Sequence, residues 1–221
     1  AVSTGIQTPI VGGLAGDALT DADFNTALGY ASLSSDTLGS RSTALGWATL
    51  NNQNFTTATD AYNVAVGFGA GLSITTGTAN TAIGGLALDA ETVGASNVAV
   101  GYAALTEQVS SGGTGTYNTA VGHLAGENIT SGIQNTIIGG LAGDALTDAD
   151  FNTAVGVAAL SADTLGTHST ALGHGALGAQ NLTTATNTYN TAVGSQAGAA
   201  VTTGRENTLI GGRCGDSLTT G

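Results

Sequence analysis

Lysine and methionine are absent from this sequence, and cysteine, proline and tryptophan each occur once. The single cysteine, Cys214, rules out an intrachain disulfide and a multi-cysteine zinc site. Charged residues make up 8% of the chain, against about a quarter in an ordinary soluble domain. We therefore do not expect a conventional globular enzyme with a charge-coated surface.

The few charges are almost all of one sign. Fifteen acidic residues face three arginines, Arg41, Arg205 and Arg213, and the net charge is -12. Such a chain repels phosphate backbones and anionic lipid, so we expect it to bind no nucleic acid. It contains no long apolar run that could cross a membrane and no signal-peptide pattern at residues 1–10, so this segment is not expected to insert into a membrane.

Glycine is abundant, and much of it belongs to an internal repeat. A five-residue core of the type Asn-Thr-Ala-Val-Gly occurs twelve times. We call its last residue the rung glycine, and we call each core together with the residues up to the next core a rung. Successive rung glycines lie 17 or 21 residues apart, which defines 17-residue and 21-residue rungs. The rung glycines are Gly12, Gly29, Gly46, Gly67, Gly84, Gly101, Gly122, Gly139, Gly156, Gly173, Gly194 and Gly211.

A longer repeat is superimposed on the rungs. The sequence of positions 12–27 returns without change at 139–154, which defines a 127-residue super-repeat. We interpret residues 1–221 as one continuous repeat array that is either a segment of a longer fibre or a subunit whose open ends stack on other copies.

The rungs predict an all-β parallel solenoid. A 17-residue rung is too short for a βαβ crossover and for the known helical repeats. Within the core pattern, Thr and the branched aliphatic residue alternate with Ala and Gly. We expect the first pair to fill the interior and the second pair to allow a close approach of another backbone. A second strand is expected after the rung glycine, for example at residues 102–105.

The interior of such a solenoid would be thin, because its side chains are mostly Ala, Val, Leu, Ile and Thr. Apolar side chains would then remain exposed on its outer side. Packing several chains around one axis would bury them, so we expect a cyclic homo-oligomer with three chains.

Three rungs carry a resemblance to known proteins: SNVAVGYAAL at residues 96–105, STALGHGAL at 169–177 and NTAVGSQAG at 190–198. They resemble the head repeats of trimeric autotransporter adhesins and, more closely, repeats in bacteriophage tail fibres. The resemblance covers all twelve rungs. It implies a left-handed parallel β-roll, a homotrimer and an extracellular location on a virion fibre or a bacterial surface. The rungs are longer than those typical of adhesin heads, and no neck, coiled-coil stalk, anchor or chaperone domain is recognisable.

Candidates for chemistry are few. His123 and His174 follow a rung glycine in a slot that tolerates many residue types, and with His168 they leave open a metal or anion site on a trimer axis. We interpret the acidic residues of the turns as solvated carboxylates. They are Asp17, Asp21 and Asp23, their repeats at 144, 148 and 150, and the related acids Asp89, Glu91 and Asp216. Calcium remains an alternative there, although no known calcium motif matches. We assign no catalytic residue, no cofactor and no metal ligand, and we interpret Cys214 as a small packing residue.

The 21-residue rungs are the main irregularity. Their longer turns, at residues 51–62, 106–117 and 178–189, each end in a tyrosine directly before the rung asparagine. Insertions in solenoids often form the binding face, and tyrosine is a favoured contact residue. Phe55, Tyr62, Tyr117 and Tyr189 are therefore candidate receptor contacts. The alternative is that these tyrosines only fix the longer turn against the body.

Three functions remain open. The sequence favours a structural, non-enzymatic surface fibre segment similar to a phage tail fibre, binding itself as a trimer and contacting a host-surface glycan or protein. A trimeric adhesin head that binds matrix or glycan is the first alternative. An ice-binding solenoid is the second, but it requires outward-facing threonines, whereas the expected facing turns them inward.

Overall fold

The computed structural model describes residues 6–113 and 115–221, and it is an all-β parallel solenoid of about twelve turns. The predicted fold class is confirmed. The chain divides into two compact units, Ala1–Thr116 and Tyr117–Gly221, each described below by itself. None of the described residues forms a helix that could span a membrane.

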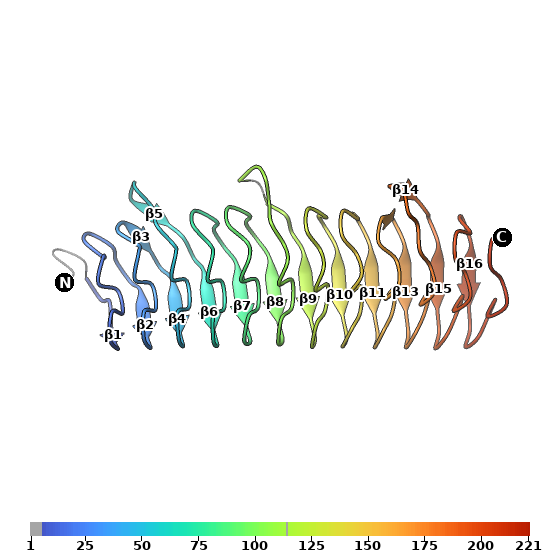
Figure 1. Ribbon diagram of the computed structural model, residues 1–221, viewed down its shortest axis with the longest axis horizontal. Helices are drawn as coiled ribbons and strands as arrows, with labels where there is room; N and C mark the ends of the chain where they lie inside the picture. Colours follow the sequence, from blue (N-terminus) through green and yellow to red (C-terminus); the bar gives the residue numbers. More distant parts are fainter. Residues whose placement is uncertain (1–5, 114) are drawn as a thin grey trace. The chain divides into compact units, whose positions relative to one another are not determined.

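In the first unit, each rung contributes one short strand to a parallel sheet (Figure 1). The strands, in order across the sheet, are β1 (Ile10–Val11), β2 (Thr26–Leu28), β4 (Thr43–Leu45), β6 (Val64–Val66), β7 (Thr81–Ile83) and β8 (Val98–Val100). A two-stranded pair, β3 (Gly39–Ser40) with β5 (Thr59–Asp60), lies at the base of the first long turn. Thr26 pairs with Thr43 and Ala27 with Ala44, so each residue stacks on its counterpart in the repeat.

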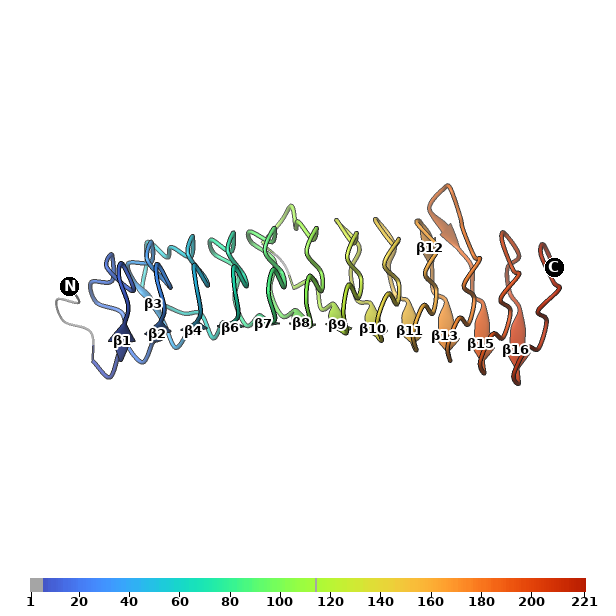
Figure 2. The same cartoon turned by 60° about the horizontal axis from the view of Figure 1, so that its bottom comes forward.

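The second unit repeats this arrangement, and its strands form a row in Figure 2. Its sheet contains β9 (Thr119–Val121), β10 (Thr136–Ile138), β11 (Thr153–Val155), β13 (Thr170–Leu172), β15 (Thr191–Val193) and β16 (Thr208–Ile210). The pair β12 (Gly166–Thr167) and β14 (Thr186–Asn187) corresponds to β3 and β5. All pairs within both units are parallel.

The strand faces are the reverse of those expected. The central residue of the three-residue strands of the main sheet points inward and is alanine in all of them except β10 and β16, as at Ala44, Ala99 and Ala154, which are fully buried. Threonine and the branched aliphatic residue point outward and are partly or fully exposed. The prediction that they fill the interior is wrong. A pattern of period two fits either facing, and the narrow interior of a 17-residue rung accommodates the smaller side chain.

The expected second strand is also absent from the described rungs. Residues 102–105 form turns, with left-handed backbone at Ala103 (φ 52°) and Leu105 (φ 53°). Their backbone groups still bond to the preceding rung: Ala103 N donates to Gly85 O at 2.9 Å, and Ala104 O accepts from Leu88 N at 3.0 Å. The rungs therefore stack through this side without regular β geometry, which alternation of apolar residues alone does not reveal.

The rung glycines make the close backbone approach that was predicted for them. Their φ angles lie between +123° and +144° in all twelve rungs. A Cβ atom on Gly67 would lie 2.6 Å from the carbonyl oxygen of Gly84 in the next rung. Only glycine combines this backbone conformation with the absence of a side chain, which is why the position does not vary.

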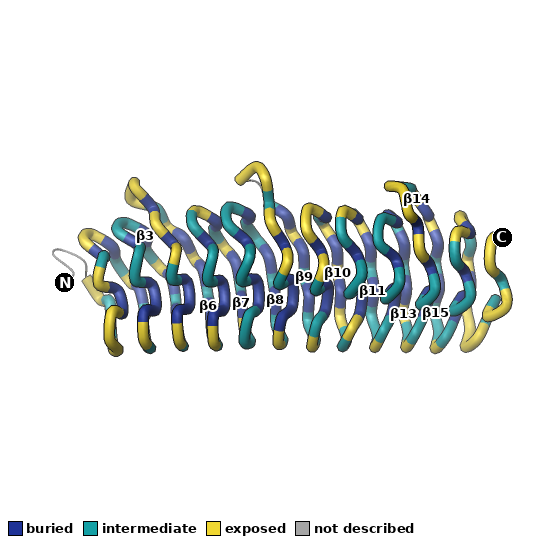
Figure 3. Tube along the Cα trace, in the orientation of Figure 1, coloured by how far each residue is buried: buried dark blue, intermediate teal, exposed yellow. Residues whose placement is uncertain are grey.

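Each rung carries a large aliphatic side chain at one of two positions after the rung glycine. Six rungs carry leucine four residues after the rung glycine, and six carry glycine there with an aliphatic residue three positions later. The first set is Leu33, Leu50, Leu88, Leu105, Leu160 and Leu177; the second is Leu19, Ile74, Ile129, Leu146, Val201 and Leu218, of which all but Leu218 are buried. In Figure 3 the buried positions recur at the same place in successive turns within each unit.

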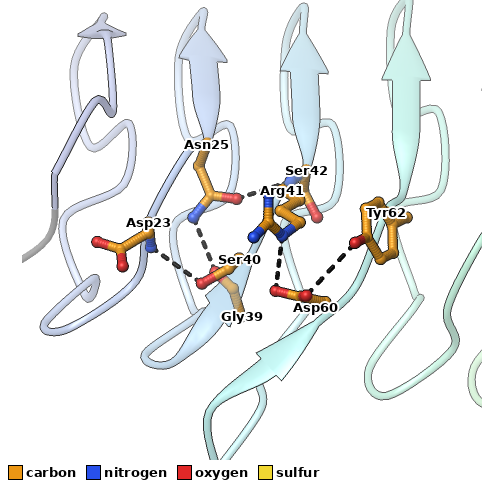
Figure 4. A network of polar contacts seen from close by, with 8 residues as sticks. All are labelled: Asp23, Asn25, Gly39, Ser40, Arg41, Ser42, Asp60 and Tyr62. Carbon is orange, nitrogen blue, oxygen red and sulfur yellow. Dashed lines mark hydrogen bonds and ion pairs between the residues drawn. The ribbon is translucent and has the colours of Figure 1, made fainter.

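The rung asparagines form a buried ladder that joins successive rungs. Asn80 is typical: its Nδ2 donates to Gly94 O at 2.8 Å, and its Oδ1 accepts from the amide of Asn97 at 3.0 Å. The same contacts join Asn25 to Gly39 and Ser42 (Figure 4). Each asparagine thus satisfies backbone groups where the chain enters the strand, as buried polar groups require.

Candidate interaction surfaces

Each long turn rests on a buried acid that the sequence analysis did not identify as a support. The acid lies seven residues after the rung glycine, and the following, longer rung places a buried glutamine at the same position. The three pairs are Asp36 with Gln53, Glu91 with Gln108 and Asp163 with Gln180. In every case glutamine Nε2 donates to the carboxylate.

Asp36 shows how the pair holds its turn. Gln53 Nε2 donates to Asp36 Oδ2 at 2.6 Å, and the amides of Gly39 and Phe55 both donate to Asp36 Oδ1 at 3.1 Å. Gln53 Oε1 in turn accepts from Asn63 Nδ2 at 2.9 Å. The carboxylate therefore replaces the backbone contacts that the inserted residues displace. Through Gln53 it also joins the long turn to the asparagine ladder.

Asp163 repeats this geometry at the equivalent position of the next super-repeat. Its Oδ2 accepts from Gln180 Nε2 at 2.5 Å, and its Oδ1 accepts from the amides of Gly166 and Leu182 at 3.1 and 3.0 Å. Gln180 Oε1 accepts from Asn190 Nδ2 at 2.8 Å. These two inserted turns, one in each unit, are thus anchored alike.

Glu91 supports the third long turn with more donors. Its Oε1 accepts from the amide of Gly94 at 2.8 Å, and its Oε2 accepts from Ser110 Oγ at 2.6 Å and Gln108 Nε2 at 2.9 Å. Burial acts to raise the pKa of Glu91, but the hydrogen bonds from Ser110, Gly94 and Gln108 outweigh it and hold the pKa below its ordinary value. Glu91 is therefore a buried structural anion, and its interpretation as a solvated turn carboxylate is wrong.

The remaining turn acids are more exposed. Asp17 and Asp216 are exposed and Asp89 is half-buried. Partial burial, together with the nearby charge of Glu127, raises the pKa of Asp144. No group of three or more His, Cys, Asp or Glu side chains within residues 6–113 and 115–221 is arranged to hold a metal ion.

The four candidate receptor contacts separate into two kinds. Phe55 is only 6% exposed, because the anchoring of its amide to Asp36 turns its ring inward over Gly39. It is therefore not available as a contact. Tyr62, Tyr117 and Tyr189 are 55%, 58% and 52% exposed. All three have left-handed backbone, with φ between 50° and 54°, which turns their rings outward from the long turns.

Tyr62 belongs to a stack of three side chains on successive rungs of the first unit, and Figure 4 shows two of them, Arg41 and Tyr62. The guanidinium carbon of Arg41 lies 4.8 Å from the centre of the Phe24 ring and 5.8 Å from the centre of the Tyr62 ring. Arg41 Nε also pairs with Asp60 Oδ1 at 2.9 Å, and this hydrogen bond and charge raise the pKa of Arg41. We call Phe24, Arg41 and Tyr62 the arginine stack.

The second unit contains the equivalent stack with histidine in the centre. The ring centre of His168 lies 4.8 Å from that of Phe151 and 5.1 Å from that of Tyr189. Tyr189 Oη accepts from Asn187 Nδ2 at 3.1 Å, much as Tyr62 Oη donates to Asp60 Oδ2 at 3.4 Å. These hydrogen bonds join Tyr62 and Tyr189 to residues of their own turns.

A second row of rings follows the rung glycines of the first unit. Tyr30, Trp47, Phe68 and Tyr102 occupy the residue after the rung glycine and are each about half exposed. Trp47 and Phe68 stack, with ring centres 4.6 Å apart and planes 8° apart. Gly85 occupies the same position on the rung between Phe68 and Tyr102. We call this row the aromatic row.

The second unit has no comparable row of large rings among its described residues. Val157, His174, Ser195 and Gly212 stand where the preceding super-repeat has Tyr30, Trp47, Phe68 and Gly85. His123 and His174 are exposed in the single chain. Cys214 is half-buried and makes no disulfide.

The outer face of each sheet carries two columns of side chains. One column is a branched aliphatic residue on every rung: Val11, Leu28, Leu45, Val66, Ile83 and Val100 in the first unit, and Val121, Ile138, Val155, Leu172, Val193 and Ile210 in the second. The other column is threonine without interruption from β9 to β16, but in the first unit Val64 and Val98 interrupt it. All these side chains are half-buried or exposed. We call this surface the outer strand face.

No pocket is present on the part of the chain that the structure describes. No protein-family model, no curated protein and no solved structure matches the chain.

Proposed function

We propose that this chain is a structural, non-enzymatic segment of an extracellular fibre, and that it assembles with two further copies of itself. The observation that supports this proposal is the outer strand face. Its aliphatic column has a member on every rung of both units, and each member is partly or fully exposed in the single chain. Continuous apolar surfaces of this kind mark association sites.

The sequence pattern is consistent with a self-complementary surface. Residues along the outer strand face recur on each rung, so a copy of the chain meets the same side chains at every step. A repeated contact adds its free energy along the whole interface, and three copies around one axis close the assembly without leaving an unpaired apolar face. A fibre segment needs this lateral closure to remain soluble.

Sedimentation equilibrium of the complete chain tests the assembly. We expect the mass of three chains at micromolar concentration. The double variant Val155→Lys/Leu172→Lys places charge on the outer strand face and should shift the mass to one chain while the β-sheet circular dichroism persists. Val109→Lys alters an exposed aliphatic residue of a long turn and is the control. A wild-type monomer at these concentrations contradicts the proposal.

Contact with a host surface is assigned to the long turns, at Tyr62, Tyr117 and Tyr189. Exposed tyrosines on inserted turns suit either a fibre tip or an adhesin head that binds glycan or matrix. Replacing all three with serine should abolish adhesion to host cells and leave the oligomer mass unchanged. Replacing Tyr30 with serine is the matched control, because Tyr30 is equally exposed but lies outside the long turns. Unchanged adhesion of the triple variant would remove this role.

Ice binding is the second candidate, and the outward threonines favour it. The objection that threonine faces inward no longer applies, because the column from Thr119 to Thr208 lies on the outer strand face. Parallel strands space such side chains at about 4.8 Å, a regular array that can order water. Thermal hysteresis by the wild type, lost in Thr153→Tyr, is the expected result for this function.

The two candidates require different states of the same face. An assembled trimer buries the outer strand face, whereas ice binding needs it free. A trimeric mass without thermal hysteresis supports the fibre, and a monomer with thermal hysteresis supports ice binding.

A further inference from the structure

The aromatic row of the first unit has a gap one rung wide. Trp47 covers one face of the Phe68 ring. Gly85, on the next rung, carries no side chain to cover the other face, and Tyr102 follows one rung later. A Cβ atom on Gly85 would have as its nearest neighbours Tyr102 Cδ2 at 3.6 Å, Tyr102 Cε2 at 3.9 Å and Phe68 O at 4.0 Å. These are ordinary van der Waals distances, so a group placed at Gly85 fits without collision and packs against the Tyr102 ring.

Elsewhere in the first unit, the position between two rings on alternate rungs is filled by a cationic side chain. In the arginine stack, three successive rungs carry a ring, a guanidinium and a ring, with 4.8 and 5.8 Å from the guanidinium carbon to the two ring centres. The second unit repeats the order with the His168 imidazole between two rings. Phe68, Gly85 and Tyr102 also lie on three successive rungs, and their central member is missing.

We propose that the gap between Phe68 and Tyr102 binds the guanidinium of an arginine side chain presented by a basic segment of a partner protein. A planar guanidinium stacks on aromatic faces and is weakly hydrated, whereas a lysine ammonium is compact and strongly hydrated. The net charge of -12 attracts a basic segment and opposes anionic ligands. Exposed rings at the gap complete the site without any rearrangement of the backbone.

The rings are not required by the fold. At the equivalent positions of the second unit, Ser195 replaces Phe68 and His174 replaces Trp47, yet β13, β15 and β16 pair in the same parallel register. These aromatic side chains are half exposed, and the equivalent rungs of the second unit lack them. We attribute their presence in the first unit to contact with a ligand.

Ligand-observed NMR on the complete chain tests the site. The probe is the tripeptide acetyl-Gly-Arg-Gly-amide, with the corresponding lysine peptide for comparison. We expect a saturable upfield shift of the arginine δ-methylene protons, because bound protons lie above the aromatic rings. The lysine peptide should bind about fivefold more weakly or worse, in line with the range for stacked cations.

Two variants separate the gap from the rest of the surface. Gly85→Leu fills the gap and should remove the shift, as should Phe68→Ala. Gly140→Leu is the matched control, because Gly140 occupies the same rung position in the second unit, between His123 and Val157, and it should bind like the wild type. Equal binding by Gly85→Leu, an uncharged Gly-Gly-Gly peptide that binds as tightly as the arginine peptide when followed by its α protons, or no shift with the wild type would each overturn the proposal. The mass of each variant is measured alongside, so that loss of this site is distinguished from loss of the assembly.

Discussion

Gln53 and Asp36 lie on adjacent rungs and share a buried hydrogen bond of 2.6 Å from Gln53 Nε2 to Asp36 Oδ2. This bond joins a long rung to the shorter rung before it. Its counterparts at Glu91 and Asp163 occur at the other two places where a long rung follows a short one. The long turns are thus specific insertions, each with its own buried support.

Replacing Asp36 with alanine should destabilise the first long turn. The amides of Gly39 and Phe55 and the Gln53 side chain would lose their acceptor, and unsatisfied buried donors cost about 1–3 kcal/mol each. We expect the free energy of unfolding to fall by about 2–4 kcal/mol, since solvent entry relieves part of the sum. Hydrogen exchange at the amides of Gly39 and Phe55 should accelerate as well. Asp17→Ala, at an exposed turn position, should change stability by less than about 0.5 kcal/mol.

The Glu91 anchor predicts a stability that depends on acid pH. Its pKa in the folded chain lies below the ordinary value of 4.5. The stabilisation is therefore fully present above about pH 4.5 and is lost as the pH falls through the lower, folded pKa. Protection of the Gly94 and Ser110 amides, measured relative to their intrinsic exchange rate at each pH, should fall over that acid range in the wild type. In Glu91→Gln the protection should already be low at neutral pH and show no such fall. Identical profiles for the two proteins would contradict the role of this carboxylate.

Gly67→Ala should destabilise the first unit strongly. The added Cβ meets Gly84 O at 2.6 Å, and φ at this residue is +138°. Backbone strain of this kind costs about 1–3 kcal/mol before the collision is counted. Gly140→Ala adds the same atom where its nearest neighbour is His123 O at 3.9 Å, so it should be close to neutral. Chemical denaturation of both variants compares them, and equal stabilities would show that the rung glycines are replaceable.

The inward facing of the central alanine is tested by enlarging it. Ala154→Ile should cost about 1–3 kcal/mol, because the buried Leu160 already fills that rung. Ala120→Ile should cost clearly less, since its rung carries Gly126 in place of leucine. The next rung contains this combination naturally, with Ile137 beside Gly143. Thermal melts distinguish the two variants, and a stable Ala154→Ile would indicate that the alanine column does not face the interior.

The periodic features of the fold were predictable from the sequence. The rung glycines, the parallel stacking and the all-β class follow from a repeat too short for any crossover helix. The buried acids were missed, although a signal for them exists: an acid seven residues after one rung glycine is followed by glutamine at the same position in the next rung. Phe55 was misassigned for a related reason, because its burial depends on the bond between its amide and Asp36, which belongs to another rung.

The sequence by itself determined that the chain repeats, that glycine must stand where backbones meet, and that its surface carries little positive charge. The tertiary structure decided which way each repeated side chain points. Alternation of period two allows threonine and valine to lie either inside or outside, and the narrow width of each turn settles the choice in favour of alanine inside. The tertiary structure also decided which rings and cations contact one another across rungs. The members of the arginine stack come from three different rungs and become neighbours only when the rungs stack in register.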